Sequence, residues 1–356
     1  MKKQSILVLF LVISGILMVR VFSAMAVERK EEEVGMTNRE GRPLVVISAP
    51  SVHDTYYAQV FDQIMEYDVE FASSVMGKDN VIILADQDTL PFLEGRVPDD
   101  ILLEAEVYDI WIRDFSTVLP TNPVKFSYRP NYLTTSVARE IEDSFMSWSE
   151  QAGLSHTSSD LILDGGNLVD NGHDKGVITE RIFSDNASYS RQELETMLKQ
   201  SLGVSEIAFI PEEEGDTTGH ADGMVMWVSQ NKLLVHQYEE PFRSQVLNAL
   251  SDALTNVEIV EVPYHYEFDE WKGFASACGI YLNSTVSDDY IYAPIFGTAH
   301  DDSMISLIRS HTDKQVVPIN AANVCFMGGS VRCLSWQVAG EQADHLIALA
   351  REKSAP

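Results

Sequence analysis

The sequence predicts a single α/β domain, and three observations lead to that prediction. Short runs rich in β-branched residues alternate with longer amphipathic stretches through most of the chain. No linker rich in Pro, Gly or Ser separates the chain into halves. The 356 residues are 45% hydrophobic and 22% charged, which is an ordinary globular composition. Because strand and helix keep alternating, we expect the domain to consist of repeated units.

Strands are predicted at the short apolar runs, and helices at the stretches with apolar residues every three or four positions. The expected elements, in chain order, are a strand at 44–47, a helix at 57–75, a strand at 81–84, a turn between 111–112 and 118–119, strands at 161–163 and 176–179, a helix at 191–202, strands at 207–210, 224–228 and 233–235, a helix at 242–254, strands at 257–262 and 290–293, a helix at 301–310 and a strand at 316–319. No G-x-G-x-x-G follows the first strand and no G-x-x-x-x-G-K-[ST] occurs, so nucleotide binding is not indicated.

The first residues predict an export signal rather than part of the fold. Two lysines precede an apolar run at 5–19, and a small-x-small cleavage site ends at Ala26. The run is shorter than the ~20 residues that span a bilayer, and Arg20 interrupts it. We therefore expect cleavage after Ala26, a secreted or periplasmic protein, and no stable membrane span after cleavage. An uncleaved anchor is the alternative.

The expected organisation has four segments: a signal peptide at 1–26, a charged N-terminal segment at 27–43, a single catalytic domain at 44–345 and a C-terminal tail at 346–356. The chain has 25 Lys and Arg against 54 Asp and Glu, a formal net charge of −29. So negative a chain is not expected to bind nucleic acid, and its charge suits a cationic small molecule.

A thiol near the C-terminal end is the first candidate for chemistry. Cys333 follows the Gly328-Gly329 pair, where the backbone can turn sharply and present a side chain to a cleft. A thiol becomes nucleophilic when its pKa falls or when a neighbouring base serves it. Cys278 and Cys325 lie in apolar contexts, so we expect small buried residues there. The pattern leaves open whether these two cysteines pair.

His220 and Asp222 form the second candidate. Residues two apart in an extended segment share a face, so both side chains are expected to point into one site. A surface loop whose polar residues cap backbone groups is the alternative. Two ligands without a third nearby do not indicate zinc, and no metal is expected.

Asp114 is the third candidate, and its surroundings indicate a bound cation. A carboxylate beside Trp111 and apolar strands is costly unless a cation binds there. A guanidinium is planar, matches carboxylates bidentately and stacks on an aromatic wall. Asp114, Asp222 and Trp111 therefore indicate a guanidinium site. An ion pair between Asp114 and Arg113 is the alternative, which the opposite orientation of neighbouring residues in a strand weakens.

Taken in order, five motifs resemble those of the guanidine-modifying superfamily: W-x-R-D at 111–114, D-G-G-N at 164–167, G-H-x-D at 219–222, Y-x-N at 281–283 and G-G-x-x-x-C at 328–333. Within it, the chain is similar to the agmatine deiminase and Porphyromonas-type peptidylarginine deiminase family over about 44–338. The resemblance implies the pentein fold, an α/β propeller of repeated ββαβ units around a pseudo-five-fold axis. It implies no metal and no organic cofactor.

The resemblance also implies roles for individual residues. Cys333 becomes the nucleophile, His220 the general acid and base, and Asp114 and Asp222 the carboxylates that hold the guanidinium. Positions that bind or shape the place for substrate are implied at Trp111, Asn283, Asp164, Gly165 and Gly166, and Arg332 is a further candidate. Arg332 departs from the family, which usually has His before the cysteine. It either binds a carboxylate or carbonyl of a bulkier substrate or is a plain solvated residue.

The expected function is hydrolytic deimination of agmatine to N-carbamoylputrescine and ammonia through a covalent thiouronium on Cys333. An exported peptidylarginine deiminase, which converts arginine in proteins or peptides to citrulline, is one alternative. A non-catalytic guanidinium-binding protein of the cell envelope is another. A cysteine peptidase or acyl transferase explains Cys333 and His220 but leaves the aspartates without a task. The expected partner is a cationic guanidino small molecule or an arginine-containing peptide.

Overall fold

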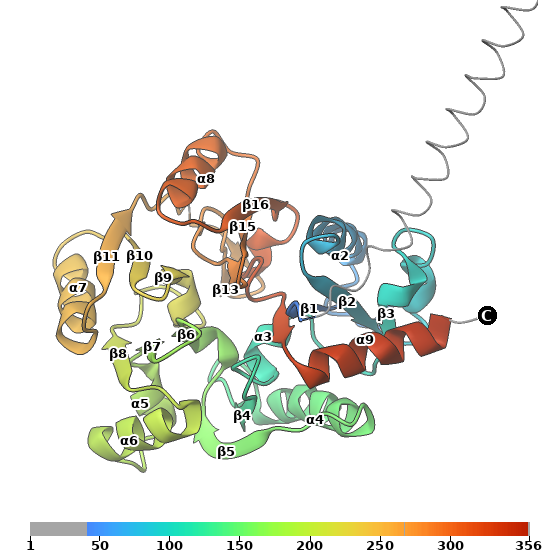
Figure 1. Ribbon diagram of the computed structural model, residues 1–356, viewed down its shortest axis with the longest axis horizontal. Coiled ribbons are helices and arrows are strands. Elements are labelled where there is room, and N and C mark those ends of the chain that lie inside the picture. The colour runs from blue at the N-terminus through green and yellow to red at the C-terminus, as the bar shows by residue number, and fades with distance from the viewer. Residues whose placement is uncertain (1–40, 267, 355–356) are drawn as a thin grey trace, which may run out of the picture.

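The computed structural model describes residues 41–266 and 268–354. The expected signal peptide lies outside these residues, as does most of the charged segment at 27–43. Among the described residues, no helix has both the length and the hydropathy to span a bilayer. Small sheets with helices on their outer side surround a common centre (Figure 1).

The repeated unit is a strand–helix–strand crossover whose two strands are parallel neighbours. The described residues contain five such pairs: β1 (Leu44–Ser48) with β2 (Asn80–Ala85), β4 (Val124–Ser127) with β5 (Thr157–Ile162), β7 (Lys175–Thr179) with β8 (Glu206–Ile210), β10 (Lys232–His236) with β11 (Glu258–Val262), and β15 (Tyr290–Ile295) with β16 (Gln315–Asn320). The crossover helices are α2 (Phe61–Val75), α4 (Thr135–Gln151), α5 (Arg181–Asp185) with α6 (Arg191–Leu202), α7 (Phe242–Ala253) and α8 (Asp301–Ser310). Five repeats agree with the predicted pentein fold.

An antiparallel strand completes most of the units. It is β6 (Leu168–Asp170) beside β7, β9 (Val225–Ser229) beside β10, β14 (Thr285–Val286) beside β15, and β17 (Trp336–Val338) beside β1. In the unit of β4, a single antiparallel bridge between Val118 and Val124 stands in its place. Because β17 pairs with β1, a strand near the end of the described chain completes the sheet that contains the first strand.

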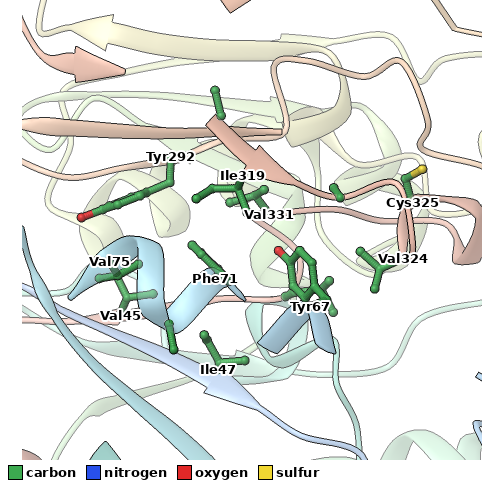
Figure 2. Close-up of a cluster of buried hydrophobic side chains, with 14 of the residues drawn as sticks. Val45, Ile47, Tyr67, Phe71, Val75, Tyr292, Ile319, Val324, Cys325 and Val331 are labelled. Atoms are coloured by element: carbon green, nitrogen blue, oxygen red, sulfur yellow. The ribbon is translucent and has the colours of Figure 1, made fainter. Parts of the chain in front are cut away.

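Apolar side chains fill both faces of the first sheet. Val45 and Ile47 of β1 pack in the same cluster as Phe71 of α2, while Leu44 and Val46 belong to a second cluster on the other face. All five positions of β1 are buried, as expected of a strand covered on both faces, and four of the five are apolar. Figure 2 shows α2 between β1 and the strands of the last unit, so the first and last units share a core.

The predicted strands and helices correspond to observed elements. The sequence did not predict β4, β6, α5, β14 and β17 of the units described above, nor four further features. These are the one-turn helix α3 (Ile112–Phe115), helix α4, the hairpin of β12 (Glu270–Trp271) and β13 (Phe274–Ala275), and helix α9 (Glu341–Ser354); the short β3 (Leu102–Glu104) extends the first sheet. Helix α3 occupies the place of the predicted turn. The prediction of a C-terminal tail from residue 346 is wrong, because Leu346, Ile347 and Ala350 of α9 are buried in the second cluster.

Candidate active site

A cavity of about 890 Å³ opens near the centre of the molecule. Six of the residues predicted for the site line this cavity: Trp111, Asp114, His220, Asp222, Asn283 and Cys333. They come from segments more than two hundred residues apart in the chain. Asp164, Gly165, Gly166 and Arg332 are not part of the lining and act from behind it.

The thiol of Cys333 is held at the cavity wall just before β17. Its side chain is only 8% exposed. Gly328 has a φ of 108°, a conformation that glycine adopts without strain. A Cβ at Gly329 would collide with the Trp111 ring and lie 2.9 Å from the Cβ of Cys333. The glycine pair therefore allows the indole and the thiol to pack against the same stretch of backbone.

Asn283 orients this thiol. Its Nδ2 donates to Sγ of Cys333 at 3.2 Å, and its Oδ1 accepts from the backbone N of Arg332 at 3.2 Å and from Ser330 Oγ at 3.0 Å. The amide therefore fixes both the side chain and the backbone around the sulfur. Asn283, which was predicted to bind or shape the place for substrate, therefore contacts the thiol.

Asp222 lies beside the thiol, with 3.8 Å between Sγ and its Oδ2. The predicted extended segment ends at His220, because Asp222 belongs to the single 3₁₀ turn Ala221–Gly223. That turn still leaves both side chains on the cavity wall. The same Oδ2 accepts from Nη1 of Arg332 at 3.0 Å. Arg332 is therefore neither solvated nor part of the cavity lining, which corrects both readings of this residue.

His220 sits between two carboxylates. Its Nε2 is 3.1 Å from Oδ2 of Asp164, and its Nδ1 is 3.6 Å from Oδ1 of Asp114. Asp164 thus orients the imidazole from behind the cavity, where the sequence indicated only a strand end that shapes the pocket. Tyr132, a cavity residue that no motif signalled, donates to the same Oδ2 of Asp164 at 3.2 Å.

The two glycines of the D-G-G-N motif allow close packing. The backbone N of Gly166 donates to Oδ1 of Asp114 at 3.1 Å. A Cβ on Gly166 would lie 2.5 Å from Nδ1 of His220 and 2.6 Å from Asp114, and one on Gly165 would collide with the carbonyl of Arg113. Neither glycine lines the cavity, so their contribution is space for the carboxylate and the imidazole.

Burial and charge perturb each titrating group. Burial raises the pKa of Asp114 to about 7, and Asp164 and Asp222 add to the rise although His220 opposes it. Burial alone lowers the pKa of His220, but Asp114, Asp164 and Asp222 outweigh it and raise that pKa to about 9. Burial, with Asp222 and Asp114, raises the pKa of the Cys333 thiol well above its usual value. The imidazole is thus protonated at neutral pH, and the thiol retains its proton.

The outer cavity is aromatic and acidic. Its walls include six carboxylates, from Asp54, Asp109, Glu140, Glu213, Glu214 and Asp216. Lys272 is the single lysine or arginine among the described lining residues, and its Nζ lies over the rings of Tyr56 and Trp271. Glu213 accepts from the hydroxyls of Tyr238 at 3.0 Å and Tyr264 at 2.7 Å. A cavity with these walls favours a cationic ligand.

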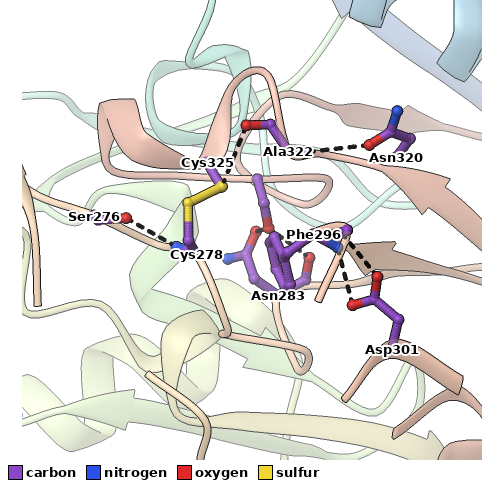
Figure 3. Close-up of a disulfide and its surroundings, with 10 residues drawn as sticks. Ser276, Cys278, Asn283, Phe296, Asp301, Asn320, Ala322 and Cys325 are labelled. Carbon is purple, nitrogen blue, oxygen red and sulfur yellow. Dashed lines mark hydrogen bonds between the residues drawn. A yellow bond between two sulfur atoms is a disulfide. The ribbon is translucent and has the colours of Figure 1, made fainter. Parts of the chain in front are cut away.

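Cys278 and Cys325 form a disulfide, which leaves Cys333 as the free thiol (Figure 3). The two cysteines are therefore paired, not separate buried hydrophobic residues. The crosslink joins the segment after β13 to the turn that precedes the glycine pair, and Ala277 and Met327 beside it line the cavity. Within the described residues, no group of His, Cys, Asp or Glu is arranged to hold a metal ion.

Five crossover units around a cavity that contains a thiol, an imidazole and paired carboxylates place the chain in the class of guanidine-modifying proteins. A family model described as Porphyromonas-type peptidyl-arginine deiminase matches residues 38–339, so the chain belongs to that family. An agmatine deiminase of Ectopseudomonas mendocina is 22% identical over 294 residues, which cover 68% of this chain and 78% of the relative.

Solved structures agree with the fold. The agmatine deiminase of C. jejuni superposes with a TM-score of 0.71 at 16% identity, covering 86% of this chain and 96% of that one. The agmatine deiminase of Enterococcus faecalis gives 0.69 at 16% identity, with the same coverage. The predicted family, pentein fold and enzyme class, a hydrolase of C–N bonds, are confirmed.

Proposed function

We propose that the protein hydrolyses the guanidino group of agmatine, giving N-carbamoylputrescine and ammonia. One observation carries the proposal: the thiol of Cys333, the imidazole of His220 and the carboxylates of Asp114 and Asp222 converge on one cavity from distant segments. A flat cation between the two carboxylates lies next to the sulfur. The agmatine deiminases among the relatives support the choice of substrate.

The chemistry follows from the positions of these groups. The Cys333 thiol loses its proton to solvent as the guanidinium binds. The carboxylates hold the cation while the thiolate attacks its central carbon, which forms the S–C bond. His220, protonated at neutral pH, gives a proton to the departing nitrogen, and the C–N bond breaks with release of ammonia. The neutral imidazole then takes a proton from water, which adds to the thiouronium carbon. As the S–C bond breaks, the hydroxyl proton of the adduct passes to the sulfur, which releases the ureido product, restores the thiol and leaves His220 protonated.

The cation itself promotes ionisation of the thiol. Burial and the neighbouring carboxylates hold the pKa of Cys333 high in the free protein. A guanidinium seated against Asp114 and Asp222 neutralises that negative charge and adds a positive one beside the sulfur. An opposite charge within about 4–6 Å lowers the pKa of an acid by about 1–3 units. The thiolate therefore forms when there is a substrate to attack.

A second substrate class is arginine within a peptide. The specific observation in its favour is the cavity volume of about 890 Å³, near the top of the range of about 300–1,000 Å³ seen for small-molecule sites. That space accommodates more than a four-carbon amine. Export, which the N-terminal sequence predicts, also favours an external substrate.

One experiment separates these possibilities. Purified protein is incubated with agmatine and, separately, with an arginine-containing peptide, and ammonia, N-carbamoylputrescine and citrulline are measured. We expect ammonia and N-carbamoylputrescine from agmatine, and loss of both in Cys333→Ser with the fold retained. Citrulline without N-carbamoylputrescine assigns the peptide substrate. Guanidinium binding that survives Cys333→Ser, with no ammonia from the unmodified protein, assigns a non-catalytic binding protein instead.

We also propose that the protein is exported and cleaved after Ala26. The disulfide between Cys278 and Cys325 supports this, because such bonds persist in oxidising compartments and are rare in the cytosol. The expected result is a mature chain that begins at Val27, recovered from the periplasm or medium and identified by its intact mass. Full-length chain in the cytosolic fraction would contradict the proposal.

A further inference from the structure

Arg332 precedes the thiol in the chain but faces the other way. Cys333 lines the cavity, whereas Arg332 does not and is 12% exposed at its side chain. Its Nη1 donates to Oδ2 of Asp222 at 3.0 Å, and its Nη2 donates to the carbonyl of Leu168 at 2.7 Å. The guanidinium is therefore fixed against Asp222 without lining the cavity.

The backbone of Arg332 is fixed as firmly as its side chain. Its N donates to Oδ1 of Asn283 at 3.2 Å, the amide that also contacts the sulfur. Its carbonyl accepts from Nε of Arg113 at 3.4 Å. The position of the guanidinium is thus tied to the position of the thiol by adjacent residues and shared contacts.

We propose that Arg332 is a positioning residue that holds Asp222 by one carboxylate oxygen and balances its charge, so that Asp222 can bind a guanidinium without suppressing ionisation of Cys333. The inference rests on the proposed function of this site. The geometry supports it directly: Nη1 of Arg332 and Sγ of Cys333 approach the same oxygen of Asp222, at 3.0 and 3.8 Å.

The charged groups around this oxygen explain why the positive charge of Arg332 affects ionisation of Cys333. The cluster consists of Arg113 and Asp114 from α3, Asp164, Asp170 from β6, His220, Asp222 and Arg332, with Tyr67 of α2 behind the thiol. With Arg332, the cluster has one more carboxylate than it has cations. Without Arg332, it has two more carboxylates than cations. The excess negative charge disfavours a second anion, which is the thiolate.

The test reads the thiol directly and needs no turnover. Since the other two cysteines are paired, iodoacetamide alkylates Cys333 alone in the intact protein. The rate is measured against pH in the wild type, Arg332→Gln, Arg332→Lys and Arg139→Gln. Arg139 is an exposed arginine on α4 and controls for the loss of one positive charge far from the sulfur.

We expect Arg332→Gln to move the midpoint of alkylation to higher pH by about one unit, the low end of the effect of a neighbouring charge. Arg332→Lys keeps the charge and is expected to keep the wild-type midpoint, as is Arg139→Gln. Superimposable profiles for Arg332→Gln and the wild type would overturn the proposal. Equal shifts in Arg332→Gln and Arg332→Lys would also overturn it, because a merely structural defect does not respond to charge.

A second readout reports the positioning of Asp222. Methylguanidine protects the thiol from iodoacetamide when it occupies the site, and the concentration that halves the rate measures its affinity. A lysine offers a single compact ammonium where Arg332 makes two contacts, so Arg332→Lys is expected to weaken protection about tenfold at unchanged pH midpoint. Wild-type protection in Arg332→Lys would overturn the positioning role, even if Arg332→Gln does not fold. Failure of the proposed function is seen separately, as absence of ammonia release by the wild-type protein.

Discussion

At the scale of single residues, Asp114 and His220 illustrate how one buried pair acquires two roles. Burial raises the pKa of Asp114 to about 7, while the surrounding carboxylates raise that of His220 to about 9 despite burial. Between these values the carboxylate is ionised and the imidazole is protonated. In the proposed reaction, the carboxylate then binds the cation and the imidazolium donates a proton to the leaving nitrogen.

The pH dependence of kcat/KM follows from this pair. We expect activity to fall as the pH drops through about 7, because Asp114 takes up a proton and the guanidinium loses a partner. Above about 9 the loss of the His220 proton opposes the gain in Cys333 thiolate, so the rise of kcat/KM with pH is expected to level off there. Initial rates of ammonia release at low substrate concentration, measured from pH 5 to 10, provide the profile. An acidic limb near pH 4, the ordinary range of an aspartate, would contradict the assignment to Asp114.

The sequence identified those site residues that stand in a local motif, and it did not identify contacts between distant segments. Cys333, His220 and Asp114 stand in motifs, and the structure places them in one cavity. For Arg332 the sequence left two alternatives, contact with the substrate or a solvated side chain. Neither is observed, because its orientation depends on Asp222, more than a hundred residues earlier. The contact between Asp164 and the imidazole also joins distant segments, which no spacing rule reveals.

At the scale of elements, helices with strong local signals were predicted closely. Helix α6 has a capping box at Ser190 and Glu193, and Gly203 ends it in the left-handed conformation with a φ of 68°. Helix α9 was missed because its buried residues are few and the surrounding sequence is polar. Its apolar face has a partner only after the first sheet and α4 have assembled.

The contribution of α9 can be measured with one substitution. Leu346 is fully buried in the cluster that covers the first sheet, so Leu346→Ala is expected to lower the free energy of unfolding by about 2–5 kcal/mol. Glu352→Ala, at an exposed position of the same helix, is expected to change it by no more than about 0.5 kcal/mol. Urea denaturation followed by circular dichroism compares the two. Equal stabilities would mean that α9 does not contribute to the core.

At the scale of the whole molecule, the disulfide links two segments 47 residues apart in the sequence. Closing such a loop in the unfolded chain removes conformational freedom, typically worth about 2–4 kcal/mol. The double variant Cys278→Ala and Cys325→Ala is expected to lose about that amount, measured by urea denaturation of the oxidised proteins. Cys333→Ser, which changes a cysteine outside the crosslink, serves as the control. An unchanged denaturation midpoint in the double variant would show that the crosslink adds no stability.

The arrangement of the units also shows the limit of a local pattern. Repeated strands and helices indicated repeated units, but only the resemblance to a family gave their number and their arrangement around an axis. The pairing of β17 with β1 brings Val338 next to Leu44, from opposite ends of the domain. Such pairing depends on the assembled ring, because the strands between them determine where the two partners meet.

The pairing of β17 with β1 has a consequence for synthesis. Cys333 lies three residues before β17, so it is among the last residues of the domain to leave the ribosome. The aspartates and the histidine are already made, but the ring cannot close until β17 reaches β1. If the site acts as proposed, a nascent chain of this protein is expected to be inert toward guanidino compounds until β17 has paired with β1.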